Sequence, residues 1–457
     1  MKRFFSIVLA LSMILSCFLF ASCEKKRDED DDWDDDTEDV SETEEDEDDK
    51  RTREEDSADR YTEEDEETED KTAFKLGVIC LHDEKSTYDK NFIDAVKKVQ
   101  RELDLEDEQI IFKKNVPESK ACYDAAEELV DEGCTVIFAN SFGHEPFLLK
   151  AAKKYDDVQF CHATGTMAHT EKLPNFHNAY ASVYEGRYLT GIAAGMKLKE
   201  MMAKDPTVIP KIGFVGSFTY AEVISAYTAF YLGVKEIVPE VTMEVQFTGS
   251  WYDEIGEKNV AKNLIENGCA VISQYSDSMG APAACEEMGV PNVSYNVSNA
   301  AACPNTYIVA SRIDWAPYLE LICEKAMAGD AEDIPTDYVG TLETGSVALT
   351  EINESVAASD TEETVEKYEK KLKKGSLEVF DTQSFTVTAS DDKNKNAATD
   401  ANGVLISYMA DVDTDSDFEA DTEAVSQDGK SFEESKYRSA PYFDLQIDGI
   451  TLLNAKF

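Results

Sequence analysis

Residues 131–143, DEGCTVIFANSFG, decide the fold, and a similar segment, NGCAVISQYSDSM, follows at residues 267–279. Each segment has a Gly-Cys turn, then a short apolar run, then a polar and aromatic cluster. Apolar residues at helical spacing precede each turn, and a helix followed by a short buried strand is the repeating unit of a parallel sheet. The repetition therefore predicts two similar α/β lobes.

The expected fold class is α/β, with two doubly wound parallel-sheet lobes around a ligand cleft. Strand-like and helix-like runs alternate along much of the chain, as in other parallel α/β proteins. Ligands of open parallel sheets bind beyond the carboxyl ends of the strands. Two sheets whose carboxyl ends face each other would enclose such a cleft.

The chain has 457 residues, more than one hydrophobic core usually serves. We expect a first lobe of residues 73–183 with about 308–335, and a second lobe of residues 184–307 with about 336–390. The strand that begins near residue 307 is assigned to the first lobe. Segments 337–352 and 376–388 are expected to be edge strands, with a charged helix over 361–374 between them. The sequence leaves open the place of an acidic C-terminal extension, 391–457.

The N-terminus predicts export. Lys2-Arg3 and the apolar run that follows are typical of a secretory signal peptide over residues 1–22. The small residues Ala21 and Ser22 precede Cys23, in a pattern that resembles a bacterial lipobox. We therefore expect a lipid-modified Cys23 at the mature N-terminus, anchored to the cell membrane and facing away from the cytoplasm. An ordinary signal peptide is the alternative.

Residues 24–71 hold 29 acidic and 8 basic residues, a net charge of −21 out of −50 for the whole chain. A segment with so few apolar residues cannot bury a core, so we expect a disordered tether over 23–72. The rest of the chain is acidic as well. Nucleic acid is therefore not an expected partner, because binding a phosphate backbone requires clusters of Lys and Arg.

The chain has ten Cys, and eight remain if Cys17 and Cys23 belong to the signal and the lipid site. An even number in an exported protein is compatible with disulfides. However, Cys80, Cys134 and Cys269 each lie in or beside an apolar run, where a free thiol is a common core residue. Buried free thiols are therefore the preferred interpretation. No CxxC pair supports a zinc or redox site.

Aromatic and polar residues recur where the predicted strands end. A flat heteroaromatic ligand could stack on such aromatics and pair its N–H or hydroxyl groups with Asp or Asn. Closure of the core is the simpler explanation for any single aromatic, but six clusters together favour the lining of a cleft. The ligand-binding candidates from these clusters are Asn140, Phe142, Phe218, Tyr220, Trp251, Asp277, Asn296 and Trp315.

The sequence resembles the basic membrane protein (BMP) family of substrate-binding lipoproteins of ABC transporters. The resemblance rests on FANSFG at 138–143, HATGT at 162–166, YEGRYLTGIAAG at 184–195, KIGFVG at 211–216, and the clusters at 251–253, 276–278 and 295–296. It implies a type I periplasmic-binding fold, a purine nucleoside or nucleobase as ligand, ABC permease subunits as partners, and a monomer. It adds Tyr88 and Asn91, in EKSTYDKNF, and Glu185 as candidate ligand-binding residues.

Two other functions stay open. An exported enzyme could act on a nucleoside or a sugar with Glu185, Asp253 or Asp277 as acid and base, although no nucleophile is evident. The second open function is that of a lipoprotein that senses a ligand without transporting it. No cofactor or catalytic motif is found. The alternating Asp residues at 411–421 are similar to a calcium loop but lack its Gly and its final Glu, so a solvated acidic loop is preferred.

Overall fold

The computed structural model describes residues 74–390, 392–412 and 420–455. The predicted signal peptide, Cys23 and the acidic tether lie outside these ranges, as does most of the calcium-like run, residues 413–419. In the described part of the chain, no helix is both long enough and apolar enough to cross a membrane.

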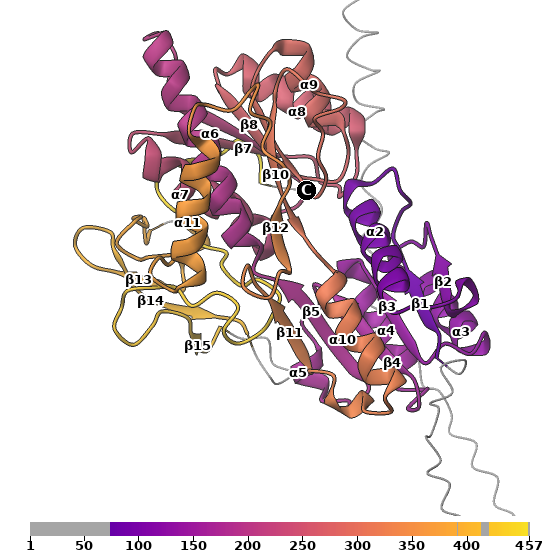
Figure 1. Cartoon of the computed structure of the whole chain (residues 1–457). Coiled ribbons are helices and arrows are strands. Elements are labelled where there is room, and N and C mark those ends of the chain that lie inside the picture. The colour runs from indigo at the N-terminus through magenta and orange to yellow at the C-terminus, as the bar shows by residue number, and fades with distance from the viewer. Residues whose placement is uncertain (1–73, 391, 413–419, 456–457) are drawn as a thin grey trace, which may run out of the picture. The chain divides into compact units, whose positions relative to one another are not determined.

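The first sheet has six strands, and all of them are parallel. Its order is β11-β5-β4-β3-β1-β2 (Figure 1). The strands are β1 (Leu76–Ile79), β2 (Ile110–Lys113), β3 (Val136–Ala139), β4 (Gln159–Ala163), β5 (Phe176–Ala181) and β11 (Asp337–Gly340).

The second sheet has seven strands in the order β12-β10-β9-β8-β6-β7-β16. All neighbours pair in parallel except β10 and β12, which are antiparallel. The strands are β6 (Lys211–Gly216), β7 (Thr242–Phe247), β8 (Val271–Tyr275), β9 (Asn292–Tyr295), β10 (Tyr307–Ile313), β12 (Val347–Leu349) and β16 (Ile450–Leu452).

Helices cover both faces of each sheet. On the first sheet, α2 (Thr87–Glu102) and α10 (Ala316–Met327) share a core with Val78 and Phe138, whereas α3 (Lys120–Asp131) and α4 (Glu145–Ala152) share another with Ile79 and Ile137. On the second, α6 (Val183–Lys204) and α7 (Ala221–Ile237) pack on one face, and α8 (Glu254–Glu266) and α9 (Gly280–Met288) on the other. The other α-helices of the described residues are α5 (Ala168–Glu171) and α11 (Thr361–Lys373). The predicted α/β class is confirmed.

The two segments that predicted the repeat have the same local geometry. Gly133 ends α3 at φ +86°, and Gly268 follows α8 at φ +89°. Only glycine adopts such values readily, and each glycine turns the chain from the helix into the following strand. The next residue, Cys134 or Cys269, is buried, and its N–H donates to Leu129 O or Leu264 O, respectively.

Three details differ from the sequence predictions. Strand β10 pairs with β9 in the second sheet, not in the first lobe as expected, although α10, which follows it, packs against α2. Strand β11 joins the first sheet beside β5, although residues 336–390 were assigned to the second lobe. Residues 376–388 form only isolated bridges rather than an edge strand, and Phe380 packs its ring against Tyr184. An apolar run predicts a strand but does not reveal which sheet will accept it.

All eight described Cys residues are buried and free: Cys80, Cys122, Cys134, Cys161, Cys269, Cys285, Cys303 and Cys323. Burial raises the pKa of the Cys161 thiol to about 12, so this thiol stays neutral. The structure thus agrees with the preferred interpretation of the cysteines as core residues.

Helices α6 and α7 pack closely through two glycines. A Cβ on Gly191 would lie 2.3 Å from Phe230 O, and one on Gly233 would lie 2.1 Å from Tyr188 O. Larger residues at these positions would force the helices apart. These helices carry Arg187 and Glu222, which belong to the site described below.

The C-terminal extension packs on the rest of the fold. It contains a small antiparallel sheet of β13 (Ala397–Thr399), β14 (Leu405–Ala410) and β15 (Thr422–Glu423), and it contributes β16 to the second sheet. Phe443 is fully buried and stacks on Phe380 at 4.3 Å. Ser439 N donates to the Asp337 carboxylate of β11 at 2.8 Å, so the extension contacts the first sheet as well.

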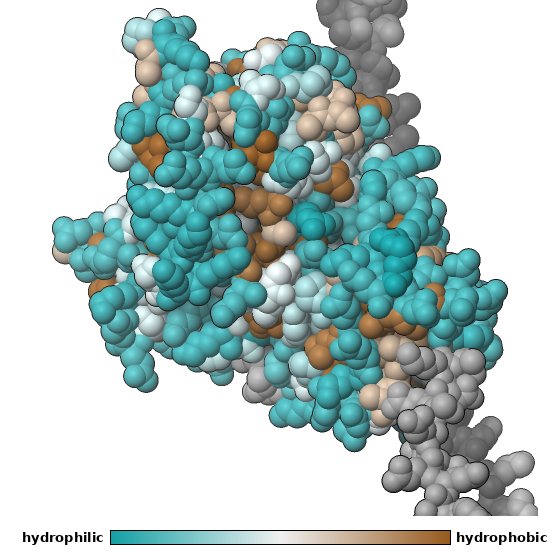
Figure 2. Space-filling model, viewed as in Figure 1, coloured by the Kyte–Doolittle hydropathy of each residue, from teal (hydrophilic) through white to brown (hydrophobic). Residues whose placement is uncertain are grey.

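Figure 2 shows that the surface seen in Figure 1 is mainly hydrophilic, with hydrophobic residues gathered around β10 and β12. A hydrophilic surface is consistent with the acidic composition of the whole chain.

We predict that Phe443→Ala lowers the free energy of unfolding by about 3–5 kcal/mol, because it removes a buried stacked ring and leaves a cavity. Urea denaturation measures the change. The matched control, Ile406→Ala, truncates an exposed residue of the same extension and should change stability by less than about 0.5 kcal/mol. Equal stability of the Phe443 variant and the wild type would show that the extension is not part of the cooperative fold.

Candidate functional site

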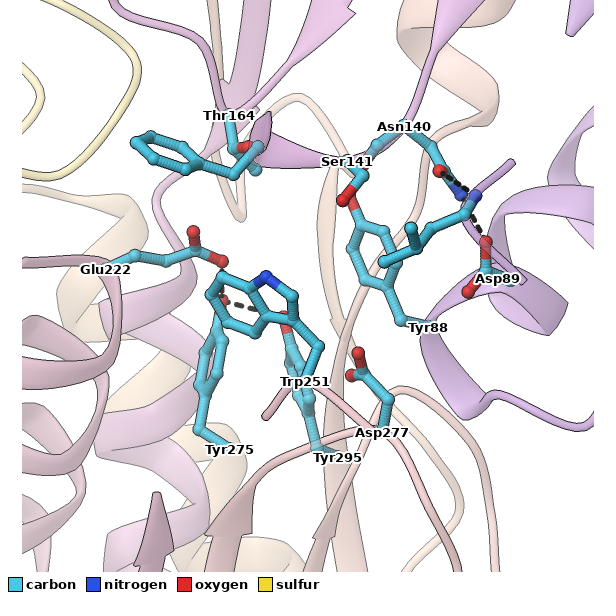
Figure 3. Close-up of a pocket in the computed structure, with 12 residues that line it drawn as sticks. Tyr88, Asp89, Asn140, Ser141, Thr164, Glu222, Trp251, Tyr275, Asp277 and Tyr295 are labelled. Atoms are coloured by element: carbon cyan, nitrogen blue, oxygen red, sulfur yellow. Dashed lines mark hydrogen bonds between the residues drawn. The ribbon is translucent and has the colours of Figure 1, made fainter. Parts of the chain in front are cut away.

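A cavity that is partly open to solvent lies between the carboxyl ends of the two sheets, and about 370 Å³ in and around it is free of protein atoms. Both sheets contribute to the lining, which Figure 3 shows. The lining residues are Leu81, Tyr88, Asp89, Asn140, Ser141, Phe142, Thr164, Glu222, Trp251, Tyr275, Asp277 and Tyr295.

Strand ends supply most of this lining. Asn140 directly follows β3, Thr164 follows β4, and Tyr275 and Tyr295 end β8 and β9. Parallel pairing brings these carboxyl ends to one edge of each sheet. The sheets are linked at the cavity by a backbone hydrogen bond of 2.8 Å from Thr87 N to Asp277 O.

Aromatic rings form much of the wall. Tyr275 and Tyr295 stack with their ring centroids 4.4 Å apart and their planes 29° from parallel. The rings of Phe142 and Tyr220 lie 5.3 Å apart, and the two residues follow strands of different sheets, β3 and β6. Such rings offer flat faces on which a planar ligand can stack.

Asp277 is a carboxyl group of the cavity whose side chain has no hydrogen-bond partner among the described residues. Its carboxylate points toward the space between the labelled residues in Figure 3 and makes no hydrogen bond to any described residue, although only 7% of Asp277 is exposed. Burial raises the pKa of Asp277 well above its usual value, and the nearby carboxylates of Asp89, Glu257 and Glu222 raise it further. A ligand that donates a hydrogen bond could satisfy this carboxylate.

Asp89 has the opposite character, although its side chain is only 1% exposed. Its Oδ1 accepts hydrogen bonds from His82 N at 3.1 Å and Asn140 Nδ2 at 2.8 Å. Burial acts to raise the pKa of Asp89, but the side chains of His82, Asn140 and Ser86, together with His82 N, outweigh it and the pKa is lowered. Asp89 is therefore an ionised structural group that holds Asn140 and the start of α2.

Glu222 lies in the first turn of α7 and is held by two tyrosines. Its Oε1 accepts hydrogen bonds from Tyr180 Oη at 2.8 Å and Tyr275 Oη at 2.5 Å. Burial raises the pKa of Glu222, whereas the two hydroxyl donors act to lower it. The buried guanidinium of Arg187 lies 4.1 Å from the ring centroid of Tyr295, next to this network.

Five of the residues predicted from the sequence line the cavity: Tyr88, Asn140, Phe142, Trp251 and Asp277. Two more lie beside them. Phe218 packs edge-on against Trp251 at 5.0 Å, and Tyr220, 43% exposed, stacks on Phe218 at 5.2 Å.

Four predicted site residues do not line the cavity. Trp315 packs into the core between Phe92 and Phe138, because its strand end faces the helices of the first sheet. Asn91 Nδ2 donates to Ile313 O at 2.6 Å and so joins α2 to β10.

Glu185 and Asn296 are the other two. Glu185 accepts a hydrogen bond from Leu342 N at 2.9 Å, and burial raises its pKa to about 7. Asn296 is buried after β9, where its N–H donates to Ser311 O at 2.9 Å and turns the chain toward β10.

Seven lining residues were not among the candidates from the sequence: Leu81, Asp89, Ser141, Thr164, Glu222, Tyr275 and Tyr295. Asp89 is adjacent to the predicted Tyr88, and Thr164 lies within the HATGT motif, so both had a local signal. Glu222 had none, because it lies within the first turn of a helix and not at a strand end.

Of the three candidate acid or base residues, Asp277 lines the cavity, whereas Asp253 and Glu185 do not. Asp253, a candidate acid or base, caps α8 by accepting a hydrogen bond from Gly256 N at 2.9 Å. Glu185 is bound to Leu342, outside the cavity. Among residues 74–390, 392–412 and 420–455, no cluster of His, Cys, Asp or Glu could hold a metal ion.

Comparison with known proteins places this geometry in a family. A family model described as "ABC transporter substrate-binding protein PnrA-like" matches residues 78–381. A purine-binding protein of Brucella abortus is 31% identical over 208 residues, which are 45% of this chain and 55% of that protein. A candidate glucose-binding protein of an ABC transporter in Haloferax volcanii is 29% identical over 263 residues, 57% of this chain and 62% of that protein.

The chain thus spans about half to three fifths of the length of these curated relatives. Among solved structures, an ABC transporter solute-binding protein from Aeropyrum pernix is similar with a TM-score of 0.57 at 14% identity, covering 70% of this chain and 95% of that chain. This likeness shows the fold, which is the type I periplasmic-binding fold expected from the sequence. Since the family model covers most of the described chain, the protein belongs to the family of PnrA-like ABC transporter substrate-binding proteins, the BMP family.

Proposed function

We propose that this protein captures a purine nucleoside or nucleobase outside the cytoplasm and delivers it to the permease of an ABC importer. The observation that carries the proposal is Asp277, a buried carboxylate without a protein donor in the described structure, in a cavity walled by aromatic rings. Stacking would hold a flat ring, and the carboxylate would accept hydrogen bonds from ribose hydroxyls or ring N–H groups. The purine-binding relative from Brucella abortus supports this choice.

The proposal includes a lipid anchor and a movable cleft. A lipidated Cys23 and the tether 23–72 would keep the monomeric binding domain close to its permease. The two sheets would belong to lobes that close on the ligand, because the lining residues come from both. An unmodified Cys23 in N-terminal peptides from the native host would contradict the anchor.

Calorimetry with adenosine, guanosine, inosine, adenine, riboflavin and glucose tests the ligand class. We expect a purine compound to bind more tightly than about 100 μM, which corresponds to roughly −5.5 kcal/mol. Glucose binding with no purine binding would instead favour the function named for the Haloferax volcanii relative. Turnover of a bound nucleoside would support the enzyme alternative.

We predict that Asp277→Ala weakens binding of the purine ligand roughly ten- to a hundredfold. Losing one buried hydrogen-bond partner costs on the order of 1–3 kcal/mol, which produces such a change in affinity. Glu254→Ala is the matched control, since it removes an exposed carboxylate from the first turn of α8. An equal affinity of the Asp277 variant and the wild type would place the ligand elsewhere.

The raised pKa of Asp277 predicts a pH dependence of binding. In the free protein the raised pKa favours the protonated acid, whereas a ligand that donates hydrogen bonds favours the carboxylate. Binding should therefore release a proton, and the affinity should fall as the pH falls through the raised pKa.

Calorimetry between about pH 8 and about pH 5 measures this dependence, in two buffers that differ in ionisation enthalpy. The Asp277→Asn variant should show a flatter profile and release fewer protons, because its amide does not titrate. Identical profiles for the variant and the wild type would remove Asp277 as the origin.

A further inference from the structure

Glu222 has one carboxylate oxygen occupied and one available. Oε1 accepts from both tyrosine hydroxyls, Tyr180 and Tyr275, whereas Oε2 makes no hydrogen bond to any residue in the described ranges. Glu222 lines the cavity, and its side chain points toward the enclosed space in Figure 3. A carboxylate oxygen only accepts hydrogen bonds, so the group it can receive from a ligand is an N–H or O–H.

The surroundings fix the position of this carboxylate. Tyr295 Oη donates to Tyr275 Oη at 3.0 Å, and the Arg187 guanidinium centre lies 5.0 Å from the Tyr275 ring centroid and 4.1 Å from that of Tyr295. Arg187 is fully buried, and its guanidinium makes no hydrogen bond to the described residues. The Arg187 cation thus stacks on Tyr275 and Tyr295 and helps to fix the ring of Tyr275, whose hydroxyl holds Glu222.

Thr164 provides a second polar group to the same cavity. It has φ +67°, an uncommon value for a β-branched residue, and it is 4% exposed. Its Oγ1 also lacks a hydrogen-bond partner in the described structure. Backbone strain of this kind occurs mainly at functional sites, where the surrounding structure maintains it. In Figure 3, Thr164 lies on the Glu222 side of Trp251, and Asp277 lies on the other side.

We infer that Glu222 is a specificity-determining residue that accepts a hydrogen bond from an N–H on the edge of the bound ring, while the Thr164 hydroxyl donates to an adjacent acceptor on that edge. The inference rests on the proposed function and deepens it. The substrate class is a heteroaromatic ring with neighbouring N–H and acceptor positions, as in the N1–H and O6 of a 6-oxopurine or the amino group and N1 of adenine. Asp277 would then accept hydrogen bonds from hydroxyl groups at the other end of the ligand.

This assignment explains how the site would separate purines from sugars. Aromatic walls and a carboxylate such as Asp277 can hold either a nucleoside or a hexose. A buried carboxyl group aimed at a ring edge discriminates, because a ligand without the matching donor leaves the free oxygen of Glu222 without a hydrogen-bond partner. Methylation of the edge nitrogen also removes the donor, and the added methyl group would clash with the Glu222 side chain.

The test compares two ligand pairs by calorimetry on the full chain: inosine with 1-methylinosine, and adenosine with N6,N6-dimethyladenosine. Within the pair that binds, the wild type should bind the unmethylated compound at least about tenfold more tightly than the methylated one. Loss of one hydrogen bond to a carboxyl group usually weakens binding by at least this factor. Wild-type protein that binds both members equally would overturn the inference without any variant.

Glu222→Gln should abolish the preference. The hydroxyls of Tyr180 and Tyr275 both donate to Oε1, so they would hold the carbonyl oxygen of Gln there and place its NH₂ where Oε2 was. The cavity would then present a donor to the ligand's N–H donor, and the preference should fall to within about threefold, below the discrimination of one hydrogen bond.

Glu254→Gln is the matched control, because it removes the same charge from an exposed position and should keep the full preference. A Glu222→Gln protein that melts as the wild type does and retains the preference would overturn the inference but not the proposed function. If the wild type binds no purine compound at all, the proposed function fails, and the inference fails with it.

Discussion

Parallel pairing of the strands is the constraint on which the site depends. It collects the carboxyl ends of β3 and β4 at one edge of the first sheet, and those of β8 and β9 at one edge of the second. Residues far apart in the sequence, such as Asn140 and Asp277, therefore line one cavity. The chain reaches this arrangement by passing between the sheets three times, after β5, β10 and β11.

Three carboxyl groups line this cavity, and each has a different role because its hydrogen-bond partners differ. Asp89 is paired with Asn140 and stays ionised, so it supports the local structure. Asp277 has no donor, and burial raises its pKa, so its carboxylate is stabilised only when a ligand supplies a donor. Glu222 is intermediate, because tyrosine hydroxyls satisfy one oxygen and leave the other for a ligand. The three side chains carry the same carboxyl group, and the residues around each one decide what it does.

The sequence was sufficient for the fold class and for part of the site. The glycine turns at Gly133 and Gly268 are local signals, and both occupy the positive φ that the pattern required. Residues at strand ends, such as Trp251 and Asp277, were identified because strand ends are where parallel sheets bind ligands. Trp315 was misplaced, since an aromatic after a strand can also close the core, and its direction depends on packing that no local pattern records. Glu222 was missed because only tertiary contacts with two tyrosines mark it.

Native mass spectrometry of the protein, purified from its host without refolding, shows whether this cavity holds a purine compound. We expect an adduct with the mass of a purine nucleoside or nucleobase, present on the wild type and lost from the Asp277→Ala variant. An adduct with the mass of a hexose, or a purine adduct retained in full by that variant, would contradict the account.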